Sequence, residues 1–501
     1  MISPSKICAV VAAADAKAAL KQLDRALEFA RTVELRLDYL KDDREITRFL
    51  DGLGKKRVRP TMIATCRRTG AGGKYRGSAA NQLIYLAEAL RAGCTWYDLD
   101  IETASIAPRG LVDVLVGEGR QLLSTHYFRK APANLKKVVA SLAAYKPDAL
   151  KLAVQADTIA ESVKVIDLAR GRSNFVAVPM GEAALPARVL ALRQGSALAF
   201  APVEQDTAPG QVPLDLMTQL YRADRLTRKS RVFGVIGDPI GHSLSPRLHN
   251  AGFQAAKIDA VFLPFLVRDL KDFLGAIKPL GIRGFAVTLP HKQEIMRHLD
   301  SVDPMAEAIG AVNTVAVGAN GKLHGLNTDY VGVLRALDKR MPFQGSRVLI
   351  VGAGGAARAV AYALAQAGSL VSITARRPQQ AEALARAVNG DAVARGKIRG
   401  QFFDAIVNTT PVGMYPHESA SSLEAAELNT QLVFDLIYRP QVTKLLQLAQ
   451  RRGIETVSGL DMFVAQGIAQ WEIWTGRRAP VAPMLAAIKR ALAANEKPKR
   501  K

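Results

Sequence analysis

A lysine and a histidine stand in two consecutive apolar segments in the first half of this 501-residue chain. Lys151 lies inside Asp148-Ala-Leu-Lys-Leu-Ala-Val154, and His126 closes Leu122-Leu-Ser-Thr-His. Burial of an unpaired lysine favours the neutral amine, which can form a Schiff base with a ketone. A histidine beside such an amine can remove and return protons. Taken singly, a paired structural lysine and a satisfied core histidine are the alternative interpretations.

Other charged and polar side chains follow apolar segments of the same half. Arg36, Arg67 and Arg188 form a candidate anion-binding set, because guanidinium groups bind carboxylates through paired hydrogen bonds. The other polar residues at such segment ends are Glu34, Asp38, Arg68, Thr207 and Gln211. This pattern suits a small carboxylate substrate.

The second half contains a glycine motif typical of a dinucleotide site. Val348-Leu-Ile-Val-Gly-Ala-Gly-Gly-Ala-Ala357 predicts a strand, a glycine turn and the start of a helix. Such a turn lets the backbone approach a pyrophosphate at the helix N-terminus. After the next predicted strand, 370–374, two arginines replace the acidic residue usual for NAD, which favours NADP. The candidate cofactor residues here are Gly352, Ala353, Gly354, Gly355, Ala356, Ala357, Arg376 and Arg377.

Three further motifs of the second half offer a carboxylate cradle and an acid–base pair. Ser243 and Ser245 carry two hydroxyl groups ahead of a predicted helix, although serines there are also ordinary helix caps. Lys292 follows Val287-Thr-Leu-Pro-His, and Asp329 follows Gly325-Leu-Asn-Thr. A lysine and an aspartate that converge on a substrate hydroxyl can handle the proton of a hydride transfer.

Short apolar runs alternate with amphipathic stretches over residues 1–226. Helix-like segments such as 16–32 and 81–92 separate runs that are too short for helices and rich in Val, Ile and Leu. Eight strand–helix repeats favour a parallel (β/α)8 barrel, whose catalytic residues gather at the C-terminal strand ends; an open doubly wound sheet is the rival. The predicted strands are 7–12, 33–37, 62–66, 96–100, 122–126, 149–152, 175–178 and 197–201.

Composition and charge narrow the function classes. Lys and Arg number 68 against 45 Asp and Glu, and the formal net charge of +23 favours anionic partners. Basic residues are dispersed apart from a short C-terminal cluster, and no zinc-finger or aromatic-basic RNA motif occurs, so we expect no nucleic acid partner. No apolar run reaches the roughly 18 residues of a membrane span, and three cysteines suggest a reducing compartment. We therefore expect a cytoplasmic protein with no membrane partner.

Several short segments of residues 1–226 occur in the order found in one enzyme family. They are Val33-Glu-Leu-Arg36, Thr65-Cys-Arg67 with Gly72-Gly73, Ser124-Thr-His126, Leu150-Lys-Leu152, Pro179-Met-Gly181 and Thr207-Ala-Pro-Gly-Gln211. This half resembles a type I 3-dehydroquinate dehydratase. The resemblance implies a barrel without a metal, in which Lys151 forms an imine with the substrate ketone and His126 acts as base and acid. It also implies a substrate-binding set of Glu34, Arg36, Arg67, Arg188, Thr207 and Gln211.

Two positions depart from that family's pattern. The family usually carries a carboxylate just before the Gly-Gly pair, where it orients the histidine, whereas this chain has Ala71. Glu34 can partly serve in its place. The loop before Arg188 reads Glu182-Ala-Ala-Leu-Pro-Ala, without the usual glycine and Ser-Arg pair. Both departures bear on the rate of dehydration more than on the reaction.

The second half carries a second ordered set of motifs. Beside those above, they are Gly310-Ala-Val-Asn-Thr314, Asn408-Thr-Thr-Pro-Val-Gly-Met414, Asp435-Leu-Ile-Tyr-Arg-Pro440 and Gly459-Leu-Asp-Met-Phe-Val-Ala-Gln466. Residues 232–490 resemble shikimate dehydrogenase, with Ala286 where the family commonly has Asn. The resemblance implies that Lys292 and Asp329 are the catalytic pair and that NADP contacts the glycine turn, Arg376, Thr409 and Met462. It implies substrate binding by Ser243, Ser245, Thr288, Asn313, Asp329, Tyr438 and Gln466.

Together the two resemblances predict an α/β enzyme for two consecutive shikimate-pathway steps. The predicted parts are a barrel at 1–226, a linker at 227–231, a substrate-binding lobe at 232–340 and 467–490, an NADP-binding Rossmann lobe at 341–466 and a basic tail at 491–501. The barrel would dehydrate 3-dehydroquinate to 3-dehydroshikimate, which the second half would reduce to shikimate with NADPH. The alternatives are a dehydrogenase with an impaired barrel, one that prefers quinate, and a non-catalytic metabolite-sensing regulator. The retained acid–base residues of both halves argue against the regulator.

Overall fold

The structure, a computed structural model, describes residues 6–56, 60–204 and 210–496. It divides into two compact units, one with Met1–Val232 and Asp259–Gly281 and the other with Phe233–Ile258 and Ile282–Lys501. The sequence-based prediction assigns all of residues 232–340 to the substrate-binding lobe. The predicted domain boundaries stay predictions. Within the described ranges, none of the helices is both long enough and apolar enough to cross a membrane.

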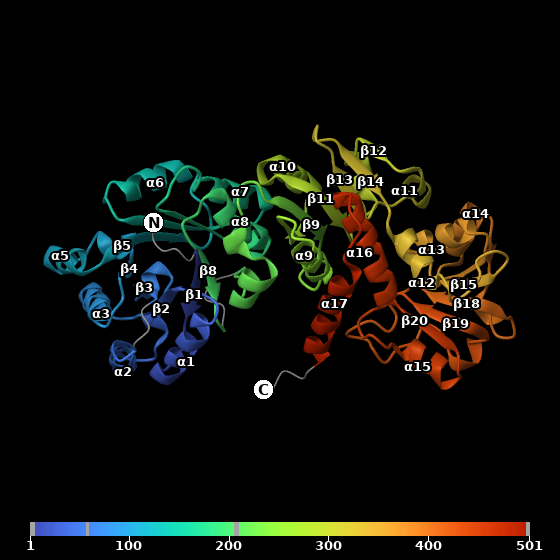
Figure 1. Ribbon diagram of the computed structural model, residues 1–501, viewed down its shortest axis with the longest axis horizontal. Helices are drawn as coiled ribbons and strands as arrows, with labels where there is room; N and C mark the ends of the chain where they lie inside the picture. The colour runs from blue at the N-terminus through green and yellow to red at the C-terminus, as the bar shows by residue number, and fades with distance from the viewer. Residues whose placement is uncertain (1–5, 57–59, 205–209, 497–501) are drawn as a thin grey trace. The chain divides into compact units, whose positions relative to one another are not determined.

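The first unit is built around a parallel barrel (Figure 1). Its eight strands neighbour one another in the order β7-β6-β5-β4-β3-β2-β1-β8, so the last strand lies beside the first. This order curls the sheet onto itself, which confirms the predicted barrel and excludes the open doubly wound sheet for this half. The strands are β1 (Ile7–Val11), β2 (Thr32–Arg36), β3 (Thr61–Thr65), β4 (Trp96–Asp100), β5 (Arg120–Tyr127), β6 (Ala149–Gln155), β7 (Phe175–Met180) and β8 (Ala199–Pro202).

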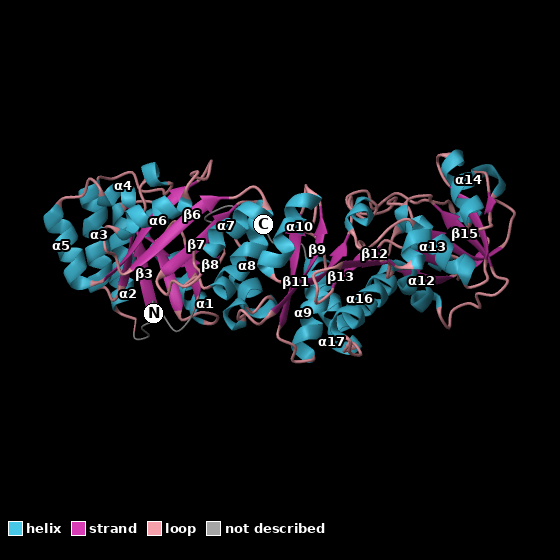
Figure 2. Ribbon diagram, turned by 90° about the horizontal axis from the view of Figure 1, so that it is seen from above, coloured by secondary structure: helices cyan, strands magenta, loops and turns pink. Residues whose placement is uncertain are grey.

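Helices cover the outside of the barrel strands (Figure 2). They are α1 (Ala16–Leu27), α2 (Asp43–Gly54), α3 (Ala79–Arg91), α4 (Ile101–Ala104), α5 (Arg109–Glu118), α6 (Leu135–Ala143), α7 (Ile159–Asp167) and α8 (Leu185–Gln194). The strands are therefore buried on both faces, as a parallel sheet requires. The predicted helix 16–32 is too long, because Thr32 is buried and opens β2, where it pairs with Cys8 of β1.

Strand β10 (Ala260–Leu266) and helix α10 (Leu270–Leu280) complete the first unit. The Asp272 carboxylate on α10 accepts hydrogen bonds from the backbone N–H groups of Ile159 and Ala160, at 2.8 and 3.0 Å. These two groups open α7, so the carboxylate satisfies donors that a helix start leaves without an intrahelical partner.

A mixed sheet begins the second unit. Its strands within this unit are β9 (Arg231–Gly237), β11 (Ile282–Val287), β13 (Thr314–Val317), β14 (Leu323–Leu326) and β12 (Ser301–Val302), in that order. The associated helices are α9 (Ser245–Ala255), α11 (Pro304–Ile309), α12 (Asp329–Leu337), α16 (Gly459–Thr475) and α17 (Val481–Glu496). Strand β13 runs antiparallel to both of its neighbours, so polar loops leave this sheet at both of its ends.

A parallel sheet forms the rest of the second unit. Its strands lie in the order β17-β16-β15-β18-β19-β20, which is the 3-2-1-4-5-6 order of a dinucleotide-binding fold and confirms the predicted Rossmann lobe. The order reverses between β15 and β18, where such folds bind ligands. The elements are β15 (Arg347–Val351), α13 (Gly355–Gln366), β16 (Leu370–Thr374), α14 (Pro378–Ala387), β17 (Asp391–Ala392), β18 (Phe403–Asn408), β19 (Thr430–Asp435), α15 (Lys444–Arg451) and β20 (Glu455–Ser458).

Candidate active sites

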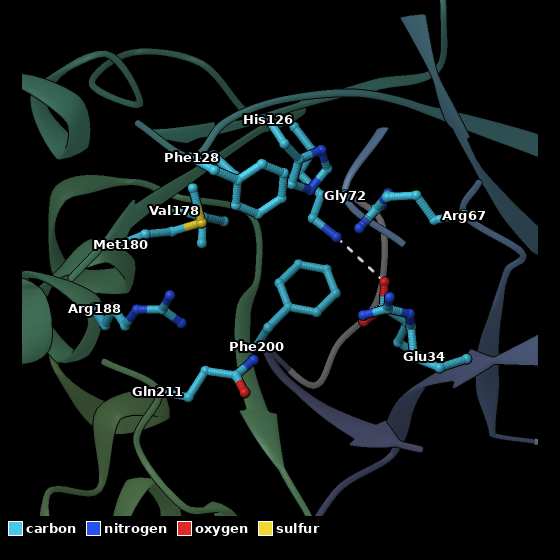
Figure 3. Close-up of a pocket in the computed structure, with 13 residues that line it drawn as sticks. Glu34, Arg67, Gly72, His126, Phe128, Val178, Met180, Arg188, Phe200 and Gln211 are labelled. Carbon is cyan, nitrogen blue, oxygen red and sulfur yellow. Dashed lines mark hydrogen bonds and ion pairs between the residues drawn. The ribbon is translucent and has the colours of Figure 1, made fainter. Parts of the chain in front are cut away.

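A cavity at the C-terminal ends of the barrel strands collects the residues expected from the sequence (Figure 3). In Figure 3, Arg188 and Gln211 lie on one side of the cavity and Glu34 and Arg67 on the other. Thr207 lies outside the described residues. The predicted residues that line this one cavity are Glu34, Arg36, Arg67, His126, Lys151, Arg188 and Gln211.

Lys151 belongs to a layer of the barrel interior that alternate strands supply. The layer consists of Glu34 on β2, Asp98 on β4, Lys151 on β6 and Phe200 on β8. Lys151 Nζ lies 3.2 Å from Glu34 Oε1, 3.0 Å from Asp98 Oδ2 and 3.9 Å from the centroid of the Phe200 ring. Two carboxylates and an aromatic face offset the cost of burying this side chain. The structure thus shows a paired lysine, whereas the sequence-based hypothesis of a neutral amine starts from an unpaired one.

Asp98 is a residue that the sequence reasoning missed. Its fully buried carboxylate also accepts hydrogen bonds from Arg67 Nη2 at 2.8 Å and from Ser124 Oγ at 2.6 Å. Burial alone would raise the pKa of Asp98, but the charges of Arg67 and Lys151 hold it well below its usual range. The available signal was an acid inside the buried segment Trp96–Asp100, because a buried carboxylate requires hydrogen-bond donors or a cationic partner.

His126 lines the same cavity from the neighbouring strand. Ser124, two residues before it on β5, pairs in register with Lys151 on β6. Burial, followed by the charges of Arg67 and Lys151, lowers the pKa of His126 well below its usual value. The imidazole is therefore neutral near pH 7 and can accept a proton.

The ring of His126 lacks the carboxylate that orients such a histidine. Among the described residues, its buried Nδ1 has no hydrogen-bond partner. Glu34 bonds instead to Lys151 and, at 2.9 Å, to Thr65 Oγ1, so our expectation that Glu34 serves the histidine is not met. Position 71, where the family carries its carboxylate, is a buried alanine beside Gly72 of the cavity wall.

Two arginines of the cavity already have protein partners. Arg36 forms a two-point ion pair with Asp38, with Nε to Oδ1 at 2.9 Å and Nη2 to Oδ2 at 2.8 Å. Arg188 Nε donates to the carbonyl oxygen of Pro179 at 2.8 Å. These bonds hold the guanidinium planes in place around the cavity, which favours recognition of a planar carboxylate.

A second cavity, of about 560 Å³, lies in the second unit. Ser243 and Ser245 stand at the start of α9, where the Ser243 hydroxyl oxygen accepts a hydrogen bond from the Ser245 backbone N–H at 3.3 Å. Ser243 thus has a hydrogen bond to the backbone in addition to its place in the cavity wall. The predicted residues that line this cavity are Ser243, Ser245, Thr288, Lys292, Asn313, Asp329, Ala356, Tyr438, Met462 and Gln466.

The Asp329 carboxylate is held at both of its oxygens. Lys292 Nζ lies 2.6 Å from Oδ2, and Asn313 Nδ2 donates to Oδ1 at 2.8 Å. The Asn313 side-chain oxygen accepts from the Thr328 backbone N–H and from Thr314 Oγ1, both at 2.7 Å. In this structure Asn313, which we expected to bind substrate, therefore also orients the Asp329 carboxylate.

Gln470, which lines the second cavity, is another residue that the sequence reasoning missed. Its Nε2 donates to the Asn313 carbonyl oxygen at 3.2 Å and to Thr314 Oγ1 at 3.0 Å. It lies one helical turn after Gln466 on α16, and that i, i+4 spacing was the signal that could have identified it. Ala286, the departure from the dehydrogenase pattern, also lines the cavity.

The glycine turn after β15 fits a dinucleotide. Gly352 has a φ of +118°, and a Cβ atom there would lie 2.4 Å from Thr409 Oγ1, so only glycine fits. A Cβ at Gly354 or Gly355 would meet open space, and in the described part of the chain α13 begins without a side-chain cap. The first N–H groups of this helix are thus accessible to a phosphate.

Arg376 and Arg377 are exposed directly after β16, which runs parallel to β15. Their guanidinium groups suit the additional phosphate of NADP. Of the described cofactor candidates, Ala356 and Met462 also line the second cavity, which thus reaches from the glycine turn to Lys292 and Asp329.

Comparisons with known proteins identify both halves. Family models match at residues 7–228 (type I 3-dehydroquinase), 235–315 (shikimate dehydrogenase substrate binding domain) and 459–489 (shikimate 5'-dehydrogenase C-terminal domain). A chloroplastic bifunctional 3-dehydroquinate dehydratase/shikimate dehydrogenase of Arabidopsis thaliana is 32% identical over 503 residues, covering 95% of this chain and 83% of that protein. The chain belongs to this bifunctional family.

Relatives of the second half alone are more similar still. The shikimate dehydrogenase (NADP(+)) of Methanothermobacter thermautotrophicus is 41% identical over 282 residues, which cover 53% of this chain and 99% of that protein. A crystal structure of a shikimate dehydrogenase in complex with NADP+ is 37% identical, with a TM-score of 0.51 over 53% of this chain and 97% of that one. As a member of the bifunctional family the chain is an enzyme with a lyase half and an NADP-dependent oxidoreductase half, which confirms the predicted family and cofactor.

Proposed function

We propose that this bifunctional enzyme converts 3-dehydroquinate to 3-dehydroshikimate in its barrel and reduces that product to shikimate with NADPH in its second half. The convergence of Lys151 and His126 in one guanidinium-rich cavity carries the proposal. The Lys292–Asp329 pair, at 2.6 Å in a separate cavity, supports the second step.

Dehydration begins when Lys151 gives one ammonium proton to neutral His126 and its free amine adds to the substrate ketone. The hydroxyl of the resulting carbinolamine takes up the proton that His126 returns and leaves as water, which gives a protonated imine. Neutral His126 removes a proton from the neighbouring carbon, and the electron pair moves toward the imine nitrogen. The hydroxyl on the next carbon leaves as water with the proton that His126 returns. Hydrolysis of the imine then releases 3-dehydroshikimate and restores Lys151.

Reduction takes place beside the Lys292–Asp329 pair. NADPH, held by the glycine turn and by Arg376, supplies a hydride to the carbonyl carbon when it is bound. Lys292 donates the proton that the carbonyl oxygen requires, and Asp329 orients Lys292 through the 2.6 Å contact. Ser243 and Ser245 hold the substrate carboxylate. Tyr438 and Gln466 contact the ring of the substrate.

The remaining predicted properties are part of the same proposal. We keep the domain limits given above and small anionic substrates, rather than nucleic acid or membranes, as the partners. Cys8, Cys66 and Cys94 are buried and form no disulfide in the described part of the chain, which suits the reducing cytoplasm. The Arabidopsis relative is described as chloroplastic, and the cytoplasmic location is proposed for this chain alone.

One observation favours a second candidate function, that of a dehydrogenase whose barrel half dehydrates 3-dehydroquinate slowly. Nδ1 of His126 has no partner among the described residues, and Ala71 provides no carboxylate. An imidazole without this support is less well oriented for proton transfer.

A coupled assay tests the proposal. Purified protein is mixed with 3-dehydroquinate and NADPH, and the enone absorbance and NADPH loss are followed together. Loss of NADPH together with formation of shikimate, rather than quinate, supports both sites, because only the dehydrated product can be reduced to shikimate. Enone formation with constant NADPH would leave a dehydratase alone. Absence of both signals, with NADPH consumed on direct addition of 3-dehydroshikimate, would indicate the impaired barrel.

A further inference from the structure

We propose that Asp98 is a positioning residue of the dehydratase site. It fixes Lys151 and Arg67 from behind the cavity and serves as the counter-ion while Lys151 carries the substrate as a protonated imine. This inference rests on the proposed imine chemistry of Lys151.

The position of Asp98 separates it from the substrate-binding residues. Its carboxylate is fully buried and, unlike Glu34, is not among the described residues that line the cavity. It nevertheless contacts side chains that the barrel brings together from three other places in the chain: Lys151 on β6, Ser124 on β5 and Arg67 after β3. Asp98 therefore acts on the reaction through these neighbours.

The proton count at Lys151 Nζ gives Asp98 its role. An ammonium has three N–H bonds, whereas a protonated imine made from it has one. The substrate carbon joins Nζ from the cavity side, so the remaining N–H points away from the cavity, where Asp98 Oδ2 lies at 3.0 Å. That oxygen can accept this hydrogen bond without a change of position.

The second oxygen of Asp98 anchors the carboxylate. Oδ1 accepts from both Arg67 Nη2, at 2.8 Å, and Ser124 Oγ, at 2.6 Å. Because Arg67 stays paired with it, the Asp98 carboxylate remains ionised when Lys151 loses and regains its proton. Because the charge is already in place, it stabilises the imine cation without reorganisation.

Asp100 provides a matched control on the same strand. It is also a buried carboxylate, but it accepts from the Thr103 backbone N–H at 2.8 Å and from Gln82 Nε2 at 3.0 Å. These two partners lie outside the cavity lining. Asp100→Asn therefore reproduces the loss of a buried charge on β4 without touching Lys151.

The experiment compares full-length wild type, Asp98→Asn and Asp100→Asn. For each protein, kcat and KM for 3-dehydroquinate are measured across pH, and the imine is trapped with borohydride and weighed by mass spectrometry. We expect Asp98→Asn to lower kcat for dehydration about 10²-fold, the usual effect of removing one preorganised electrostatic group. We also expect it to move the alkaline limb of the kcat profile to a lower pH. The shift should be about 1–3 pH units, because an opposite charge at this distance changes the pKa of the cation that it faces, here the protonated imine, by that amount. KM should change less than kcat.

A purely structural role predicts a different result. Asp98→Asn would then lower the melting temperature and the active fraction but leave the alkaline limb where wild type has it. Asp98→Glu, which restores the charge, should return the limb toward wild type. An Asp98→Asn profile equal to that of Asp100→Asn overturns the inference.

The readouts also separate this inference from the proposed function. If wild type gives no trapped adduct on Lys151, the imine chemistry fails and the role of Asp98 fails with it. If wild type gives the adduct and Asp98→Asn matches Asp100→Asn, the role of Asp98 alone fails. Should Asp98→Asn not fold, Ser124→Ala decides: a severalfold lower kcat at constant KM supports the inference, and an unchanged kcat overturns it.

Discussion

Replacement of Lys151 by arginine separates charge from nucleophilicity at the centre of the barrel. Nζ of Lys151 lies between Glu34 and Asp98, and its side chain is only 6% exposed. Lys151→Ala would leave two buried carboxylates short of a cation, which costs about 3–5 kcal/mol of the free energy of unfolding. A guanidinium keeps the positive charge but does not form an imine, and its extra volume costs about 1–3 kcal/mol. Lys151→Arg is therefore the variant that tests chemistry rather than folding.

The expected loss of dehydratase activity follows from the catalytic contributions that remain in Lys151→Arg. Enzymes accelerate reactions by at least about 10⁶-fold, of which acid–base help from His126 accounts for about 10²–10⁴-fold. The imine pathway and substrate binding must supply the rest, so we expect Lys151→Arg to lower kcat for dehydration at least about 10²-fold, or about 2.7 kcal/mol. Shikimate oxidation with NADP should remain within about twofold of wild type, because Lys292 and Asp329 lie in the other compact unit.

The assay follows enone formation from 3-dehydroquinate and NADPH formation from shikimate on one preparation. The dehydrogenase rate is an internal measure of active protein, and thermal unfolding reports on the barrel. Normal dehydration by Lys151→Arg would refute the imine mechanism. Loss of both activities would point to misfolding, and Lys151→Met would then repeat the test without the added volume.

Three further expectations concern the cofactor, the histidine and pH. Arg376→Asp should raise the KM for NADP about tenfold relative to that for NAD, because it removes a charge-assisted contact to the phosphate, and an unchanged ratio would argue against this role. Ala71→Glu should raise kcat for dehydration about tenfold if the new carboxylate reaches Nδ1 of His126, whereas Ala71→Gln, of equal size, should give less. Burial and the charges of Arg67 and Lys151 lower the pKa of His126. We therefore expect kcat/KM for dehydration to stay level as pH falls through about 6.5 and to decline only at lower pH. A midpoint at or above about 6.5 would contradict this expectation. Unfolding then takes up a proton in that range, so the stability of the barrel should decrease as pH falls below about 6.5.

Local patterns were sufficient to predict the eight barrel strands and the glycine turn, whereas the reaction of each half was predicted from its resemblance to a known family. The predicted strand 370–374 coincides with β16, and Gly352 has the positive φ that the glycine motif implies. Lys151 and His126 could be selected because a charged or titratable group in an apolar strand is unusual in itself. The hydrophobic period of a segment and the residues of its turns depend on residues close together in the chain, so a single sequence is enough to identify them.

Only the tertiary structure decided which side chains meet. Asp98 and Glu34 lie 53 and 117 residues from Lys151 in the chain, and they contact it because alternate strands of a closed barrel share one interior layer. The lowered pKa of His126 and the use of Asn313 to hold Asp329 follow in the same way from packing. So does the lack of a hydrogen-bond partner for His126 Nδ1 in the described ranges. Such contacts depend on strand order, stagger and closure, which no local period encodes. The sequence by itself therefore determined what kind of enzyme this is, whereas the closed barrel determined which charges control its lysine.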